Sequence, residues 1–315
     1  MMRNPVFESS MKRRMRSFRS PLLITLYCAF LLAVSFMAII TLQNATISLN
    51  DLRSGLQTYI YLAIMQFMLI ILVAPALTSG AISGERERQT LDLLLCTRVG
   101  AVRIVLGKLL SSVSFLALMI ISSLPAMAIT LFFGGISIWD MLLMELFLLI
   151  TALACCSIGI FCSALFKRTV TATVVSYLAI FAIGVGTLIV PILFQSRQLS
   201  NVINMASSYS SSVGIIYSSG GGMQTLSSAV LELPKLIFVN PAAGLLSLLV
   251  QQTGMMQSTL GNLFGYRGAE LLSVIEMVNS IAWINMVVLM VCSVLLTVVA
   301  ALFVKPTGRR AKKRK

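Results

Sequence analysis

The feature that most constrains this chain is a series of six long apolar stretches. Crossing the roughly 30 Å hydrocarbon core of a bilayer takes about 20 helical residues, and each stretch reaches that length. The stretches are Leu22–Leu42, Tyr59–Thr78, Leu109–Phe133, Met141–Phe166, Thr169–Phe194 and Ile281–Val304. Only 11% of the 315 residues are charged and 58% are hydrophobic, which excludes an ordinary soluble domain. The sequence therefore predicts an all-α polytopic membrane protein with six transmembrane helices.

The placement of lysine and arginine predicts the orientation of these spans. Twenty of the 24 basic residues lie on the side that holds both termini, and four lie on the other side. Those four are Arg53, Arg197, Lys235 and Arg267. Because lysine and arginine are retained in the cytoplasm, both termini are predicted to be cytoplasmic in a protein of the cell membrane. Trp139, Trp283, Tyr59 and Tyr61 then fall at the outer interface, where aromatic rings gather.

The net charge of +14 therefore reflects the orientation of the spans in the membrane, and it does not indicate a nucleic-acid partner.

The chain divides into a segment at 1–21, a six-span domain at 22–304 and a basic tail at 305–315. Within 1–21, Phe7, Met11, Met15 and Phe18 recur at helical spacing among basic residues. This pattern predicts a cytoplasmic amphipathic helix on the bilayer surface. It is either a connecting helix that transmits motion to the first span or a simple topology anchor.

The external region at 195–280 contains a further apolar segment, Lys235–Val250. It is short, and Asn240-Pro241 interrupts it. A seventh span here would move the basic tail to the outside, against the charge distribution. The segment is therefore predicted to be a re-entrant or interfacial helix.

The loop at 79–108 between the second and third spans has the most specific pattern in the sequence. Ser83 is predicted to cap a helix over 84–97, with two acids in the first turn, where they suit the positive end of the helix dipole. Three leucines follow as an apolar stripe at i, i+3 and i+4. The product is an amphipathic cytoplasmic helix with one charged face for a soluble partner.

The stretch GERERQTLDLLL, followed by VLGK, resembles the coupling loop of the type-2 (ABC-2-like) exporter permeases. The segments NPVFESSMKRRMRS and FVNPAAGLL resemble that family's connecting helix and its Asn-Pro element before the last span. The family often has glycine where this chain has Gln89, a change that helix propensity tolerates.

This resemblance implies that the chain is the membrane-spanning permease subunit of an ATP-driven ABC exporter. Such a subunit forms the substrate pathway as a dimer with a second permease chain and is coupled to separate ABC ATPase subunits. Glu85, Arg86, Glu87 and Arg88 are then expected to face the ATPase. The leucines expected to support the docking surface are Leu91, Leu94 and Leu95.

No phosphate-binding motif is found in the sequence. Between Gly100 and Gly107-Lys108 there are six residues where a phosphate loop has four, and Leu109 stands where serine or threonine would bind Mg²⁺. The chain also has no histidine. We therefore predict a transport subunit that is not an enzyme and has no catalytic residue, metal site or cofactor of its own. ATP and Mg²⁺ are expected on the partner ATPase.

Polar residues inside the predicted spans are sparse. The candidates for the substrate pathway are Gln66, Glu145 and Asn285. Glu145 is the only acid well inside a span, and its alternatives are to snorkel toward the interface or to stay protonated. Gln66 and Asn285 are also candidates for hydrogen bonds between helices.

A stripe of small residues marks the fourth span. It consists of Cys155, Gly159 and Ser163, at i, i+4 and i+8. Small residues at this spacing allow helix backbones to approach closely, so the stripe predicts a tight helix contact.

Two other classes of protein fit the sequence less well than a permease does. An ion- or proton-coupled secondary transporter would need buried charges near mid-membrane and paired broken helices, and only Glu145 is available. An integral-membrane enzyme would need a cluster of catalytic side chains near one membrane face, and the sequence shows none. Substrate identity, transport direction and the choice between homodimer and heterodimer stay open.

Overall fold

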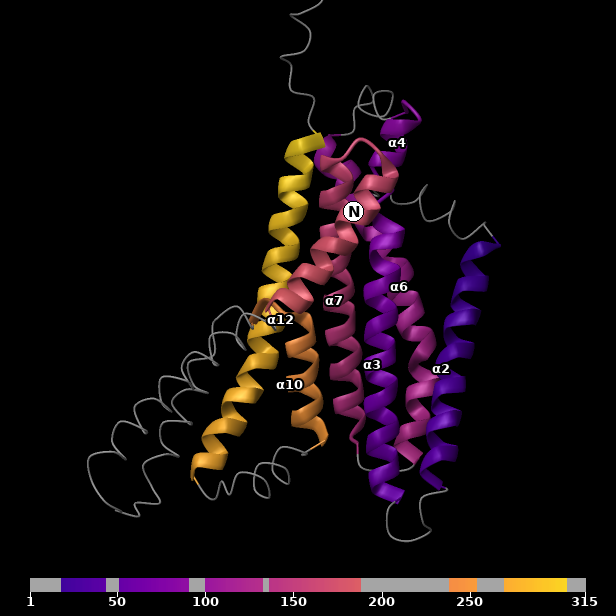
Figure 1. Cartoon of the computed structure of the whole chain (residues 1–315), viewed down its shortest axis with the longest axis vertical. Helices are drawn as coiled ribbons and strands as arrows, with labels where there is room; N and C mark the ends of the chain where they lie inside the picture. Colours follow the sequence, from indigo (N-terminus) through magenta and orange to yellow (C-terminus); the bar gives the residue numbers. More distant parts are fainter. Residues whose placement is uncertain are drawn as a thin grey trace, which may run out of the picture.

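The computed structural model describes residues 18–43, 51–90, 100–132, 136–187, 238–253 and 269–304. Within these ranges the chain forms helices and no strand (Figure 1). Six of the helices are long and apolar enough to cross a membrane. The structure thus confirms the predicted all-α fold and the six predicted spans.

The six long helices follow the apolar stretches but most extend beyond them. They are α2 (Arg19–Gln43), α3 (Asp51–Thr78), α6 (Ala101–Phe132), α7 (Ile138–Leu165), an unlabelled helix over Thr169–Thr187, and α12 (Ala269–Val304). Two shorter helices are α4 (Ser83–Glu87) and α10 (Pro241–Thr253). α3, α6 and α12 begin well before their apolar stretches, because backbone hydrogen bonding continues through polar residues outside the apolar core.

α7 is the central helix of the bundle (Figure 1). It packs against α12, α3 and α6, whereas α2 lies at one side against α3 and α6. In the most apolar part of α7, 67% of the residues are buried, against 22% in α2. α10 packs mainly on α12 and lies at the end of the bundle opposite α4.

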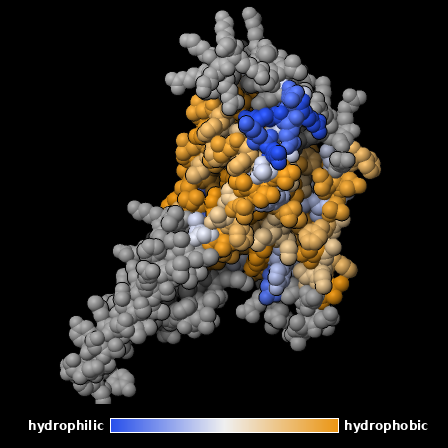
Figure 2. Space-filling view, turned by 45° about the horizontal axis from the view of Figure 1, so that its top comes forward, coloured by the Kyte–Doolittle hydropathy of each residue, from blue (hydrophilic) through white to orange (hydrophobic). Residues whose placement is uncertain are grey.

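The outer faces of the long helices are apolar. On α12, Val287, Val291, Val294 and Val298 recur on one side of the helix and each is more than half exposed. Figure 2 shows the same property as a hydrophobic wall below a hydrophilic area at the top. Such a wall is stable only in contact with lipid or with other apolar surfaces.

The aromatic side chains expected at the outer interface differ in exposure. Trp139, Trp283 and Tyr61 are exposed, in keeping with a place at an interface. Tyr59 is completely buried inside the bundle, so its ring does not face lipid. Its hydroxyl donates a 2.6 Å hydrogen bond to Oε1 of Gln252 on α10, which provides a polar partner inside the bundle.

Several predicted features lie outside the described residues. They are most of the amphipathic segment at 1–21, the leucines at 91, 94 and 95, most of the external region at 195–280, and the tail at 305–315.

Candidate functional site

The first part of the loop at 79–108 is anchored directly to α3. The backbone of residues 79–82 turns through hydrogen bonds from Ser79 N to Pro75 O and from Ala81 N to Thr78 O. A further bond, from Gly84 N to Gly80 O, leads into α4. α4 therefore extends from the end of α3, and we call this end of the molecule the α4 end (top of Figure 1).

The cap of α4 comes from another helix. Ser83 was predicted to cap it, and this prediction is wrong: Ser83 is the first helical residue, and its hydroxyl donates to Ser79 O at 2.8 Å. Instead, Oγ of Ser163 on α7 accepts hydrogen bonds from Ile82 N and Ser83 N, both at 2.9 Å. The unsatisfied donors at a helix start need such an acceptor, and here the acceptor ties α7 to α4.

One turn before Ser163, α7 touches α3 at Gly159. A Cβ atom on Gly159 would lie 2.0 Å from Oγ1 of Thr78 and 3.6 Å from the Cα of Pro75. Glycine is required here because the two helices approach so closely. The predicted tight contact is therefore confirmed at Gly159 and Ser163, whereas Cys155 lines a cavity described below.

Glu85 pairs with a lysine at the start of the third span. Nζ of Lys108 lies 2.5 Å from Oε1 of Glu85 and also donates to the carbonyl oxygen of Ala81. The lysine side chain is only 10% exposed and the glutamate 26%. This mostly buried ion pair joins α4 to α6.

Glu87 binds the start of the fifth spanning helix. Its two carboxylate oxygens accept hydrogen bonds from the backbone N–H and the hydroxyl of Thr169, each at 2.9 Å. The bonds from Thr169 lower the pKa of Glu87, which lies in α4 beyond the end of α3. A carboxylate is well placed here, because it faces the positive end of the Thr169–Thr187 helix.

α4 ends much earlier than predicted. It stops at Glu87, and Gln89 has a φ of 57°, in the left-handed region. The predicted continuous helix over 84–97 is therefore broken at Gln89. The expectation from helix propensity at Gln89 is also wrong, because a backbone with this φ favours glycine for its tolerance of the left-handed region.

The residues around this turn form the hydrophilic part of the α4 end. Arg88, Gln89 and Thr90 are exposed, as are Lys167 and Arg168 just before the Thr169–Thr187 helix, and Arg86 is partly exposed. Figure 2 shows a hydrophilic area at the corresponding end of the molecule. This polar, mainly basic surface is open to a soluble partner.

Gln66 and Glu145 meet inside the bundle. Nε2 of Gln66 donates to Oε2 of Glu145 at 2.9 Å and to Oγ of Ser123 at 2.8 Å, which connects α3, α7 and α6. Glu145 is 7% exposed, so it does not snorkel, and that alternative is wrong. The carboxyl group of Glu145 finds its polar contact in the amide group of Gln66 and does not need to reach the membrane interface.

Asn285 holds the start of α10 against α12. Its amide nitrogen donates to the carbonyl oxygens of Phe238 and Asn240, at 2.8 and 2.9 Å. A Cβ on Gly244 of α10 would lie 2.3 Å from Oδ1 of Asn285, so this contact is tight. The predicted hydrogen bond between helices is thus confirmed at Gln66, whereas Asn285 binds the segment just before α10.

The comparison with protein families decides the class of the molecule. Residues 25–302 match the model of the ABC-2 family transporter protein. The chain belongs to the ABC-2 transporter family. It is the multi-pass membrane permease component of a transporter, without a catalytic domain, and ABC-2 permeases work with ATPase partner subunits. No curated protein matches the chain.

In this ABC-2 permease, sequence reasoning missed the residues that receive the loop's contacts. Ser163, Lys108 and Thr169 were not assigned a role at the α4 end. Thr169 carried the clearest signal, because a hydroxyl residue that begins an apolar helix after two basic residues is a common helix start.

Proposed function

We propose that this permease is the membrane component of an exporter, forms its pathway as a dimer and is driven through the loop at 79–108. A second permease chain, identical or related, would complete the dimer. ATP and Mg²⁺ would bind to the separate ATPase subunits, which dock on the loop. Their closure would move the loop and bias the pathway between two states.

The observation that carries this proposal is the set of contacts at the α4 end. α4 is continuous with the turn after α3, paired with α6 through Glu85 and Lys108, capped by Ser163 of α7 and bound to Thr169 through Glu87. Four spanning helices thus meet at one short segment. A displacement of this segment would be passed to all four, which is what a coupling element requires.

The orientation of the loop rests on the charge distribution. The side that holds both termini and this loop has twenty of the 24 basic residues, so we place both termini and the α4 end in the cytoplasm. An ATPase in the cytoplasm would then reach the exposed basic residues of the α4 end.

The contacts divide the coupling residues into two groups. Glu85 and Glu87 bind within the chain, so we assign to them the task of holding the loop against the spans. Arg86 is partly exposed and Arg88 is exposed, and we assign to them and to the leucines at 91, 94 and 95 the contact with the ATPase.

The residues proposed for the substrate pathway hydrogen-bond within this single chain. Gln66 and Glu145 bind each other, and Asn285 binds the segment before α10. Their role in the pathway stays a prediction, and we favour the task of fixing the helices relative to one another.

We further propose that α10 is re-entrant. Pro241, its first residue, borders a cavity lined by residues from the middle of α7 and α12. Eleven residues later, Nε2 of Gln252 donates to the carbonyl oxygen of Asp140 at the start of α7. α10 therefore runs along half of α7, as a helix that enters the membrane and returns would do.

Purification from the native membrane tests the proposal. The epitope-tagged chain should retain an ABC ATPase, and the combined Arg86→Glu and Arg88→Glu substitutions should reduce its recovery, because they reverse the charge of the docking surface. Arg53→Glu, at the start of α3 and on the opposite side, is the matched control and should leave recovery unchanged. The proposal fails if no ATPase is retained, or if the chain hydrolyses ATP by itself.

A further inference from the structure

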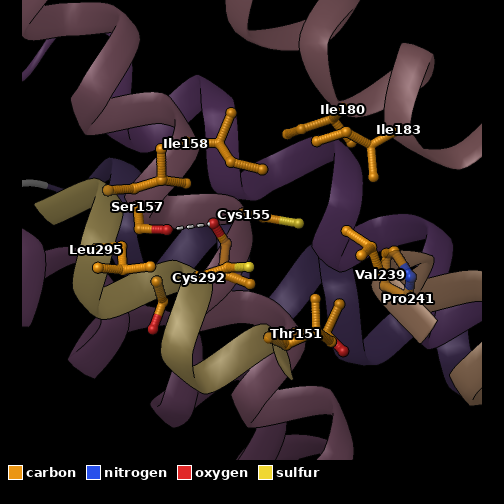
Figure 3. Close-up of a pocket in the computed structure, with 14 residues that line it drawn as sticks. Thr151, Cys155, Ser157, Ile158, Ile180, Ile183, Val239, Pro241, Cys292 and Leu295 are labelled. Carbon is orange, nitrogen blue, oxygen red and sulfur yellow. Dashed lines mark hydrogen bonds between the residues drawn. The ribbon is translucent and has the colours of Figure 1, made fainter. Parts of the chain in front are cut away.

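A cavity of about 300 Å³ lies beside the middle of α7 (Figure 3). α7 contributes one wall through residues such as Ala154 and Cys155. Ile180 and Ile183 of the Thr169–Thr187 helix face Cys292 and Leu295 of α12 across it. The start of α10, at Pro241, closes one end.

The cavity offers no polar group to a ligand. Three hydroxyl residues line it, but each donates to a carbonyl oxygen of its own helix. Thr151 donates to Phe147 O at 3.0 Å, Ser157 to Ala154 O at 2.7 Å and Ser293 to Met290 O at 2.7 Å. The remaining lining is aliphatic or thiol, so a molecule bound here gains only apolar contacts.

The neighbouring helix start is also satisfied. At the beginning of α10, Oδ1 of Asn240 accepts from Ala242 N at 2.9 Å, and Pro241 has no N–H to donate. The first two residues of α10 therefore offer no free donor to a charged or polar head group at this end of the cavity. The occupant that fits is the end of a hydrocarbon chain.

The cavity borders the lipid-facing wall of the protein. Leu295, at its edge, is 59% exposed, and Phe181 on the flanking helix is 65% exposed. Both are apolar, so the approach to the cavity between the two helices is apolar as well. In a membrane, this approach is filled by acyl chains.

We propose that the cavity binds the terminal part of one acyl chain of a membrane phospholipid, which enters from the side between the Thr169–Thr187 helix and α12. A cavity of about 150 Å³ accommodates the six carbons of benzene, so this one has room for about twelve carbons. Left empty, a space of this size forfeits the dispersion contacts of its whole lining. The bound chain makes the lipid part of the packing between two spans, and this inference does not depend on how the permease is driven.

The test uses the full chain in bilayer nanodiscs made with phosphatidylcholine that carries a photoreactive diazirine at the end of one acyl chain. Ala154 and Cys155 are buried, so a lipid reaches them only through the cavity. After irradiation, peptide mass spectrometry should find lipid attached to this part of α7. Cys292→Trp fills the cavity and should abolish that attachment, whereas Val298→Trp, on the exposed face of the same helix, should leave it unchanged.

Ile183→Trp fills the cavity from the opposite wall and should also abolish the attachment. If Cys292→Trp does not give a monodisperse protein with a normal melting temperature, Ile183→Trp is the variant that tests the inference. The inference is overturned if lipid attaches only to exposed residues such as Val294 in the unsubstituted chain. It is equally overturned if attachment at Ala154 and Cys155 persists in a folded filling variant, or if the purified protein has an apolar molecule other than phospholipid in this cavity.

Discussion

Replacing Gly159 by alanine should strain the contact on which the α4 end is built. The added Cβ would lie 2.0 Å from Oγ1 of Thr78, where about 3.4 Å is comfortable, so the two helices or the threonine side chain must move by more than 1 Å. Overpacking of this kind costs about 1–3 kcal/mol. We expect Gly159→Ala to lower the free energy of unfolding by about 2 kcal/mol.

Thr78→Ala completes a double-mutant cycle with Gly159→Ala, because it removes the Oγ1 atom that the new Cβ would meet. Thr78 donates its hydroxyl to Ala74 O in its own helix, so Thr78→Ala alone should cost about 1 kcal/mol. With Oγ1 gone, the new Cβ still lies 3.0 Å from the Cβ of residue 78 and 3.6 Å from the Cα of Pro75, so most of the strain is relieved. The double variant should therefore be more stable than the sum of the single effects predicts, by about 1–2 kcal/mol.

The free energies can be measured by reversible denaturation in detergent micelles, followed by the fluorescence of Trp139 and Trp283. Gly186→Ala is the matched control, because a Cβ at that position meets nothing within 4 Å. Strict additivity of the two substitutions, or a Gly159→Ala variant as stable as the control, would refute the reasoning.

Three further predictions concern the loop and α10. Because the bonds from Thr169 hold the pKa of Glu87 below its ordinary value of 4.5, the stability that this contact contributes is complete at neutral pH and is lost as the pH falls below 4.5. Glu87→Ala at pH 7 should therefore raise hydrogen exchange at the start of the Thr169–Thr187 helix; unchanged exchange would contradict the contact. Because the φ of residue 89 is 57°, Gln89→Gly should raise the free energy of unfolding by about 0.5 kcal/mol and Gln89→Val should lower it by about 1 kcal/mol. Equal melting temperatures for the two variants would show that the turn is not left-handed. Asn285→Ala removes one buried and one partly buried hydrogen bond, so it should cost about 2–3 kcal/mol and should speed hydrogen exchange in α10. No change in either quantity would contradict its role as an anchor.

The spans were predictable because the property that defines them is local. A run of about 20 apolar residues must become a helix in lipid, so the apolar stretch ending at Thr78 and the helix that contains it end at the same residue. The starts were less predictable. α12 begins at Ala269 and not at Ile281, because hydrogen bonding along a helix continues where hydropathy falls.

The hydrogen-bonded pairs of residues within the bundle could be predicted only in part. The polarity of Gln66 and Glu145 marked both as residues in need of a partner, but nothing in the sequence shows that 79 positions apart they bind each other. Ser163 gave even less information, because a small residue in a stripe predicts close packing and not a hydrogen bond to another helix start.

The loop at 79–108 was recognisable from its charges, although its local geometry was not. That the acids face the ATPase stays a prediction, and within the chain Glu85 binds Lys108 and Glu87 binds Thr169. Both contacts are formed between segments far apart in the sequence, so local pattern cannot reveal them. The turn at Gln89 was hidden for a different reason. Glutamine is an ordinary helix residue, but here its left-handed backbone ends α4, with hydrogen bonds from Gln89 N to Arg86 O and from Thr90 N to Glu85 O.

The most direct test of the account is a photo-crosslink from the α4 end to the motor. A photoreactive phenylalanine derivative placed at Arg88 in the chain expressed in its native membrane should, on irradiation, attach to an ABC ATPase. The same group at Arg53 should attach to none. Absence of an ATPase from the Arg88 product, or equal attachment from both positions, would contradict the claim that this loop couples the permease to ATP hydrolysis.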